Sequence, residues 1–292
     1  MKSLIMPRKM YWFALPALLF YLLFWITPLF RLLGYSFTDF NGYAQQYNLV
    51  GLTNYQTLLK EGTMANSIVN TLIYTVLVVA AGNLLSLAAA LALNMKIRGK
   101  GLYRSLFYIP ALFSTIVVGF IWSYVYMPKA GMIPALINNL GIKSNLDLLG
   151  NYKSALYAIA AVDIWKNLGT GIVIFLAGLQ GVPTDLLEAG DIDGCSKWQL
   201  TRHIRLPLLA PAITINVTLG VINGLKAFDY PFIMTTGGPG KATYTIIYHI
   251  YRLAFNEQLF GKAAALGIVS FAIIILITSI MVLFMRKREV SV

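Results

Sequence analysis

The side chains that most often perform catalysis or bind metals are scarce in this sequence. One cysteine, Cys195, excludes a disulfide framework and a cysteine-rich metal site, and two histidines, His203 and His249, leave little for imidazole ligation. The sequence contains neither a His-Glu-x-x-His motif nor a Gly-x-Ser-x-Gly motif, and its carboxylates are scattered. We therefore expect no catalytic residue, no metal site and no enzyme activity, and no cofactor on this chain.

Polar side chains with other capabilities lie inside two long apolar stretches. Such groups are costly at membrane depth and usually face a cavity or a neighbouring helix. The first stretch contains Asp163, Trp165, Lys166, Asn167 and Thr170, and the second contains Asn216, Thr218, Asn223, Lys226 and Asp229.

The composition is that of a membrane protein. Hydrophobic residues make up 58% of the chain and charged residues 12%, whereas soluble domains carry roughly a quarter charged residues. The net charge of +12 would suggest nucleic-acid binding in a soluble protein, but the cations cluster between apolar runs. This distribution favours membrane insertion.

Six apolar stretches are long enough to cross a bilayer as helices, which takes roughly 20 residues. The first exceeds the apolar core of a cleaved signal peptide, so we expect it to stay attached. We predict an all-α polytopic membrane protein with about six transmembrane helices, at residues 11–33, 68–93, 102–127, 155–179, 210–234 and 263–285.

The distribution of Lys and Arg predicts the orientation. With the N-terminus inside, thirteen of these cations fall in cytoplasmic segments, including Lys2, Arg8 and Lys9, and eight fall outside. Cytoplasmic loops of membrane proteins carry this excess. We expect both termini to be cytoplasmic.

One cytoplasmic segment, 180–209, is unusually long and predicts a helix-turn-helix. Thr184 is a candidate N-cap, and Asp185 and Glu188 place negative charge in the first turn of a helix. Gly194 should end this helix, and a second one should follow from about Ser196 to Arg205.

The same segment resembles the EAA loop of permeases from binding-protein-dependent ABC importers. The family pattern is Glu-Ala-Ala, three residues, Gly, nine residues and Ile-x-Leu-Pro. The matching positions here are Glu188, Ala189, Gly190, Gly194, Ile204, Leu206 and Pro207. The resemblance implies that this coupling loop docks on a separate ATPase subunit. Gly190 departs from the usual Ala, which should weaken local helicity without preventing docking.

Further segments resemble the carbohydrate branch of that family, in particular subunits similar to the larger permease of the maltose importer. They are 50–55, 70–71, 176–180 and 236–239. The resemblance implies one permease domain over 1–292, with a core at 66–285. It also implies a second permease subunit, two ATPase subunits that bind ATP and Mg, an extracellular solute-binding protein, and a bacterial cytoplasmic (inner) membrane as the location.

A sugar site needs amide or hydroxyl partners beside aromatic rings. Asn167, Thr170 and Asn223 fit this need, with Trp122 and Trp165 as possible platforms. Similarity to the sugar-contacting positions of the maltose permease implies a substrate path at Thr115, Asn167, Thr170, Gly220, Asn223 and Gly224. The alternative is that these side chains only bond to neighbouring helices.

Two charged pairs are spaced one helical turn apart. Asp163 with Lys166, and Lys226 with Asp229, are expected to form structural ion pairs.

The alternative for the whole chain is a secondary transporter driven by an ion gradient, which would be expected to show internal repeats and broken helices. We find no convincing repeat, and that reading leaves the coupling loop without a role.

Overall fold

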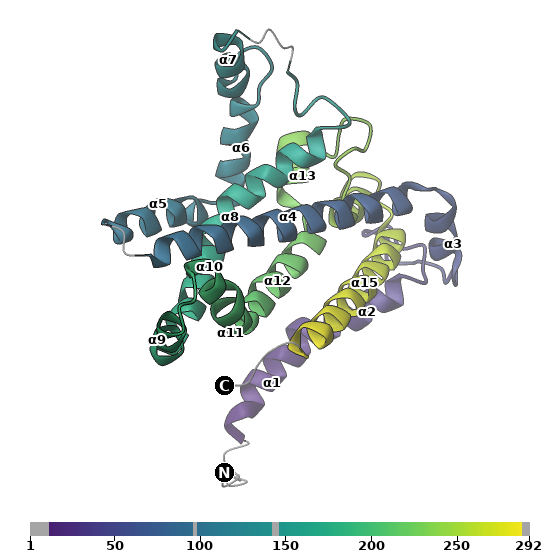
Figure 1. Cartoon of the computed structure of the whole chain (residues 1–292). Coiled ribbons are helices and arrows are strands. Elements are labelled where there is room, and N and C mark those ends of the chain that lie inside the picture. Colours follow the sequence, from purple (N-terminus) through teal and green to yellow (C-terminus); the bar gives the residue numbers. More distant parts are fainter. Residues whose placement is uncertain (1–11, 96–97, 142–145, 288–292) are drawn as a thin grey trace. The chain divides into compact units, whose positions relative to one another are not determined.

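The computed structural model describes residues 12–95, 98–141 and 146–287. In this part of the chain the structure is helical, with a single isolated β-bridge between Thr38 and Leu49 (Figure 1). Contacts divide the chain into two units. The first runs to residue 64 and includes 249–271, and the second comprises 65–248 and the chain from 272 onward.

The first unit begins with a span of 24 residues, Trp12–Tyr35. It consists of α1 (Leu15–Tyr21), a π-helical segment (Leu22–Ile26) and α2 (Thr27–Tyr35). α3 (Thr53–Lys60) follows after a loop. The Asn54 amide donates to the backbone oxygens of Ser36 (2.9 Å) and Thr38 (2.8 Å), which fixes this loop against α3.

The same unit contains the start of α15 (Phe260–Arg286). The backbone N–H of Gly261 donates to the Phe40 carbonyl (2.8 Å), and the Lys262 ammonium pairs with Glu61. The N-terminal loop and the beginning of the last helix are therefore joined by both backbone and charge contacts.

The second unit contains most of the remaining helices. They are α4 (Thr63–Asn94), α5 (Lys100–Leu112), α6 (Thr115–Val125), α7 (Met132–Asn139), α8 (Ala155–Gln180), α9 (Thr184–Ile192), α10 (Lys197–Leu200), α11 (Leu206–Leu208), α12 (Ala210–Leu225), α13 (Asp229–Thr235) and α14 (Ile246–Tyr251). α4 begins just before this unit, and α14 ends just beyond it.

Four of the six predicted spans are confirmed as long apolar helices. They are Trp12–Tyr35, Thr63–Asn94, Ala155–Gln180 and Phe260–Arg286. Residue 11 and the cations Lys2, Arg8 and Lys9 lie outside the described residues. Counting each bent helix pair as one span gives up to six crossings, the predicted number. The second of these pairs joins Lys197–Leu208 to Ala210–Leu225 at 65°, so it includes part of the predicted coupling loop.

The other two predicted spans are not continuous helices. Residues 102–127 form α5 and α6, which meet at 97°. Pro110 lies inside α5, and Phe113 and Ser114 take extended backbone angles, so the helix ends there. The predicted span 210–234 is interrupted after α12, because residues 226–228 leave the helix before α13 begins.

α8 packs closely against three neighbouring helices through small residues. A Cβ on Gly169 would lie 2.3 Å from the Phe107 backbone oxygen in α5. A Cβ on Gly171 would lie 2.5 Å from Ser86 Oγ in α4, and one on Gly178 would lie 2.8 Å from Ala212 Cβ in α12. Small residues let membrane helices approach in this way.

We predict that Gly169→Ala separates α5 from α8, because the obstructing atoms belong to the backbone of Phe107 and Tyr108 and cannot rotate away. Overpacking of this kind costs about 1–3 kcal/mol. Thermal unfolding of the purified protein should show a lower midpoint than the wild type.

Gly101→Ala is the matched control, because it lies in α5 and its Cβ would meet no atom within 4 Å. Equal midpoints for the two variants would contradict the close approach of α5 and α8.

Candidate functional site

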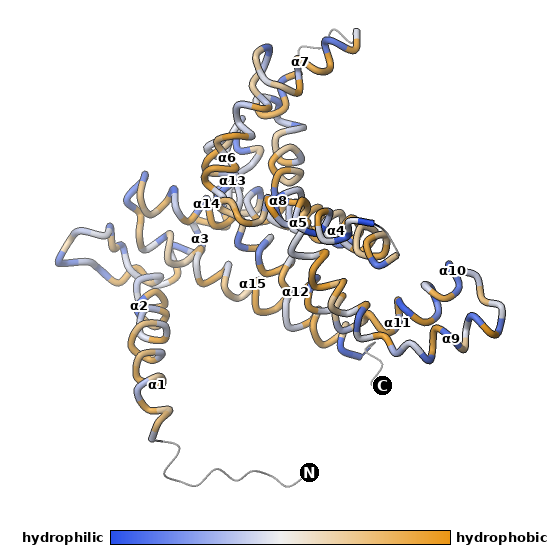
Figure 2. The backbone as a smooth tube through the Cα atoms, turned by 90° about the vertical axis from the view of Figure 1, so that its left-hand side faces the viewer, coloured by the Kyte–Doolittle hydropathy of each residue, from blue (hydrophilic) through white to orange (hydrophobic). Residues whose placement is uncertain are grey.

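The segment 180–209 folds as the expected helix-turn-helix, and Figures 1 and 2 show α9 and α10 projecting beyond the ends of α8 and α12. Gly194 has φ +78°, a left-handed conformation that ends α9 at little cost only for glycine. Ser196 and Gln199 then form a capping box that starts α10. The second predicted helix continues through the π-helical segment Thr201–Arg205.

Two details of this prediction were wrong. Asp185 lies in the first turn of α9, as expected, but Glu188 does not. Pro183 occupies the N-cap position of α9, and Thr184 is the first helical residue. The Thr184 hydroxyl contacts the Asp185 carboxylate (3.4 Å) and makes no capping bond.

The departure from the family pattern at Gly190 has a structural counterpart. A Cβ at this position would lie 2.5 Å from Leu200 Cδ2 and 3.2 Å from Ile204 Cδ1. Gly190 is buried, whereas Glu188 and Ala189 are exposed on α9. The glycine therefore lets the two arms of the hairpin pack closely while the charged face of α9 remains accessible.

The hairpin also exposes large apolar side chains. Ile192 is 86% exposed and Trp198 is 64% exposed, and Glu188 lies on the same small element. Exposed apolar groups that adjoin charged groups are typical of a protein docking surface.

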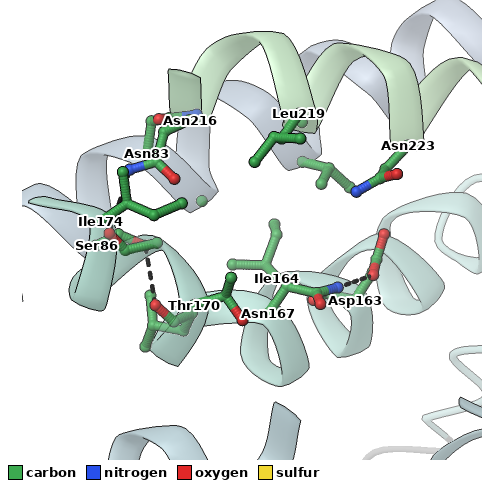
Figure 3. A pocket seen from close by; sticks show the side chains of 15 residues that line it. Asn83, Ser86, Asp163, Ile164, Asn167, Thr170, Ile174, Asn216, Leu219 and Asn223 are labelled. Atoms are coloured by element: carbon green, nitrogen blue, oxygen red, sulfur yellow. Dashed lines mark hydrogen bonds between the residues drawn. The ribbon is translucent and has the colours of Figure 1, made fainter. Parts of the chain in front are cut away.

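α4, α8 and α12 line an open cleft with polar and apolar walls and an empty volume of about 650 Å³, open space included, which we call the amide cleft (Figure 3). Asparagine side chains enter it from all three helices. Those residues are Asn83, Asn167, Asn216 and Asn223.

The amide cleft contains four residues of the predicted substrate path: Asn167, Thr170, Gly220 and Asn223. Thr170 and Asn223 are exposed to it, and their side chains make no hydrogen bond within the described chain. Asn216, by contrast, donates to the Gly171 carbonyl (3.2 Å) and joins two helices. This cavity therefore contains both a side chain that joins helices and side chains that make no hydrogen bond within the described chain.

A second cavity adjoins the first and shares Asp163, Asn167 and Asn223 with it. This charged cleft has an empty volume of about 730 Å³. Thr115, at the start of α6, lines it, together with Lys166, Lys226 and Asp229. Gly224 lines neither cavity, because it packs against Thr75 of α4, whose Cα is 2.9 Å from a Cβ built on the glycine.

Neither expected ion pair forms. The Asp163 carboxylate accepts hydrogen bonds from the Tyr74 hydroxyl (2.8 Å) and from the Asn167 amide (2.6 Å) in place of Lys166. Lys226 and Asp229 do not share a helix, because α12 ends at Leu225 and α13 begins at Asp229. The expectation of an ion pair at one-turn spacing required a continuous helix, which Lys226 and Asp229 lack, and no competing hydrogen-bond donor, which Asp163 has in Tyr74 and Asn167.

The proposed aromatic platforms also lie elsewhere. Trp122 and Trp165 pack edge to face with ring centroids 5.3 Å apart, and neither lines the two clefts.

Sequence reasoning missed Asn83 and Ser86, which line the amide cleft from α4. Asn83 Oδ1 is buried and accepts no hydrogen bond from any described residue. Two polar residues three positions apart in the apolar stretch 68–93 were the available signal.

Comparisons with known proteins agree with this architecture. The sequence model of the family described as "Binding-protein-dependent transport system inner membrane component" matches residues 82–290. The chain is 32% identical over 286 residues to the "Probable starch degradation products transport system permease protein AmyD" of Thermoanaerobacterium thermosulfurigenes, covering 96% of this chain and 95% of that protein. It is 33% identical over 284 residues to the "Multiple sugar-binding transport system permease protein MsmF" of Streptococcus mutans, covering 96% and 97%.

Among solved structures, the chain is similar to a subunit of a bacterial ABC transporter involved in importing the acidic polysaccharide alginate. The TM-score is 0.83 at 21% identity, with 96% of this chain and 95% of that chain covered. This likeness supports the fold.

We predict that Gly194→Ala loosens the helix-turn-helix, because alanine does not readily adopt φ +78°. The expected cost is about 1 kcal/mol, measured as faster amide hydrogen exchange in α9. Gly181→Ala is the control, since Gly181 has right-handed backbone angles (φ −82°) and a Cβ there would meet only ordinary contacts. Unchanged exchange in Gly194→Ala would contradict the role of the turn.

Proposed function

Since the chain belongs to the family of binding-protein-dependent transport system inner membrane components, it is a permease subunit of an ATP-driven importer, and we propose that it carries a sugar or an oligosaccharide by alternating access. The observation that carries the coupling mechanism is the projecting hairpin α9–α10. It presents Glu188, Ile192 and Trp198 to a partner.

The amide cleft supports a sugar as the solute. Its free side chains are amides and hydroxyls, which can both donate and accept hydrogen bonds as sugar hydroxyls do. The relatives AmyD and MsmF are described as permeases for starch degradation products and for multiple sugars. We therefore take a malto-oligosaccharide as the first solute to test.

The partners follow from the mechanism. A second permease subunit, two ATPase subunits that bind ATP and Mg, and an extracellular solute-binding protein complete the importer. The coupling residues are the seven motif positions, and the substrate path comprises the predicted residues that line the clefts, with Gly224 as a packing position beside them. The protein lies in the bacterial cytoplasmic membrane with both termini and the hairpin in the cytoplasm.

In this mechanism, closure of the ATPase dimer moves the hairpin, and the hairpin moves α8 and α12, to which it is covalently joined. The cleft between these helices then opens toward the outside to receive solute. This chain supplies the path and the mechanical connection, and the ATPase subunits supply the hydrolysis. A self-sufficient secondary transporter would instead take up solute in vesicles without any ATPase.

We predict that Glu188→Lys prevents both capture of the ATPase subunit in detergent and ATP-driven uptake of maltotriose in proteoliposomes, because it reverses an exposed charge on the docking element. The loss of uptake should exceed about tenfold. Glu257→Lys, another exposed charge reversal that lies outside the hairpin, is the control. Persistence of both capture and uptake in Glu188→Lys would show that the hairpin does not couple the subunits.

The orientation can be tested at the only thiol, Cys195, which is partly exposed at the turn of the hairpin. We predict that a membrane-permeant maleimide labels it in intact cells lacking the ATPase subunits and that an impermeant maleimide does so only after lysis. Labelling of intact cells by the impermeant reagent would place the hairpin outside and refute the coupling mechanism.

A further inference from the structure

Asn167 is held by two bonds to a single residue one turn earlier in α8. Its Nδ2 atom donates to the Asp163 carboxylate Oδ1 (2.6 Å) and to the Asp163 backbone oxygen (3.1 Å). Figure 3 shows the amide nitrogen directed at Asp163. The carboxylate is fixed in turn by Tyr74 of α4, which is 1% exposed and donates to Oδ2 (2.8 Å).

The chemistry of the carboxylate determines which end of the amide faces it. An ionised carboxylate only accepts hydrogen bonds, whereas an amide has a donating NH₂ end and an accepting carbonyl end. The Asp163 backbone oxygen also only accepts, so the NH₂ end of Asn167 faces Asp163. Both of its N–H groups are used there, so Asn167 retains only its carbonyl oxygen for a further partner.

That oxygen accepts no hydrogen bond from any described residue, and Asn167 is exposed and lines both clefts. The side-chain amide of Asn223, across the cavity on α12, makes no hydrogen bond within the described chain and can offer either of its ends (Figure 3). The two asparagines thus differ: one has a fixed orientation and the other does not.

We propose that Asp163 is a positioning residue of the solute path, whose carboxylate orients the Asn167 amide so that position 167 accepts a hydrogen bond from one solute hydroxyl and donates none. This inference rests on the proposed function as a sugar permease. The Asn167 carbonyl oxygen, which lines both clefts, would then favour solutes that place a hydroxyl donor opposite it.

Asp163→Asn tests this assignment. An asparagine at 163 has one accepting end, and both Tyr74 and Asn167 donate to this position. Tyr74 is almost completely buried, so its hydroxyl keeps the oxygen of the new amide as acceptor, and the NH₂ end of that amide faces position 167. The Asn167 amide then reverses and presents its own NH₂ to the cleft. The importer should then discriminate less against a solute that lacks the hydroxyl donor opposite position 167.

The experiment uses the complete importer in proteoliposomes with maltotriose and its monofluoro analogues, in each of which fluorine replaces one hydroxyl and cannot donate a hydrogen bond. The measurement is the uptake rate of each analogue divided by that of maltotriose. Because every preparation contains the same binding protein, its preferences cancel when the ratio for a variant is divided by that for the wild type.

We expect Asp163→Asn to raise the ratio for one analogue about three- to tenfold, the effect of one hydrogen bond, and to leave the others unchanged. Asn167→Ala, which keeps the Tyr74–Asp163 bond, should raise the ratio for the same analogue. Asp147→Asn is the control, because Asp147 is exposed and lines neither cleft.

A uniform change over all analogues, or none, would overturn the inference and leave the proposed function intact. If Asp163→Asn fails to assemble, Asn167→Ala decides the result by the same criterion. Absence of maltotriose uptake by the wild-type importer would overturn the proposed solute and this inference with it.

Discussion

The close packing of α8 is the constraint on which the second unit depends. Two glycines bring the backbone of α8 against α5 and α12, and a third brings it against Ser86 of α4. Membrane helices gain little from burying apolar surface against one another, because lipid is equally apolar, so close van der Waals contact must hold them together. The glycines supply that contact, and the apolar side chains around them, such as Ile172 and Phe175, are almost completely buried.

The same helix presents a different surface between its two packed regions. One buried cluster joins α8 to α4, α6 and α13, and the other joins it to α4 and to the region around the start of α12. The amide cleft lies along the α8 segment that begins at Asp163 and ends at Ile174. Helices held rigidly at both ends can leave a polar gap between them without collapsing, and a solute path needs such a gap. Packing and cavity are thus two consequences of one arrangement.

The sequence predicted those parts of the fold whose signals are local. Long apolar runs predicted four spans, and the arrangement of Pro183, Gly194 and Ser196 predicted the hairpin to within a residue. The two broken spans were predicted as continuous, because apolar composition does not distinguish a helix from a helix that turns by 97°. Pro110 was visible in the sequence, yet proline also occurs inside intact membrane helices, where neighbouring groups satisfy the freed carbonyl.

The solute path was only partly predictable, because its polar residues choose partners that the sequence does not reveal. Lys166 was the expected partner of Asp163 from the spacing along the helix, but Tyr74 lies 89 positions away and comes into contact only after α4 packs on α8. A partly buried carboxylate is stabilised by short hydrogen bonds, and a tyrosine hydroxyl supplies one without the entropy lost on fixing a long lysine chain. Lys166 then makes no ion pair in the part of the chain described, and it lines the charged cleft, where a charge costs less than it would in lipid. Tertiary packing therefore decides which polar residues are already bonded and which remain able to bind a solute.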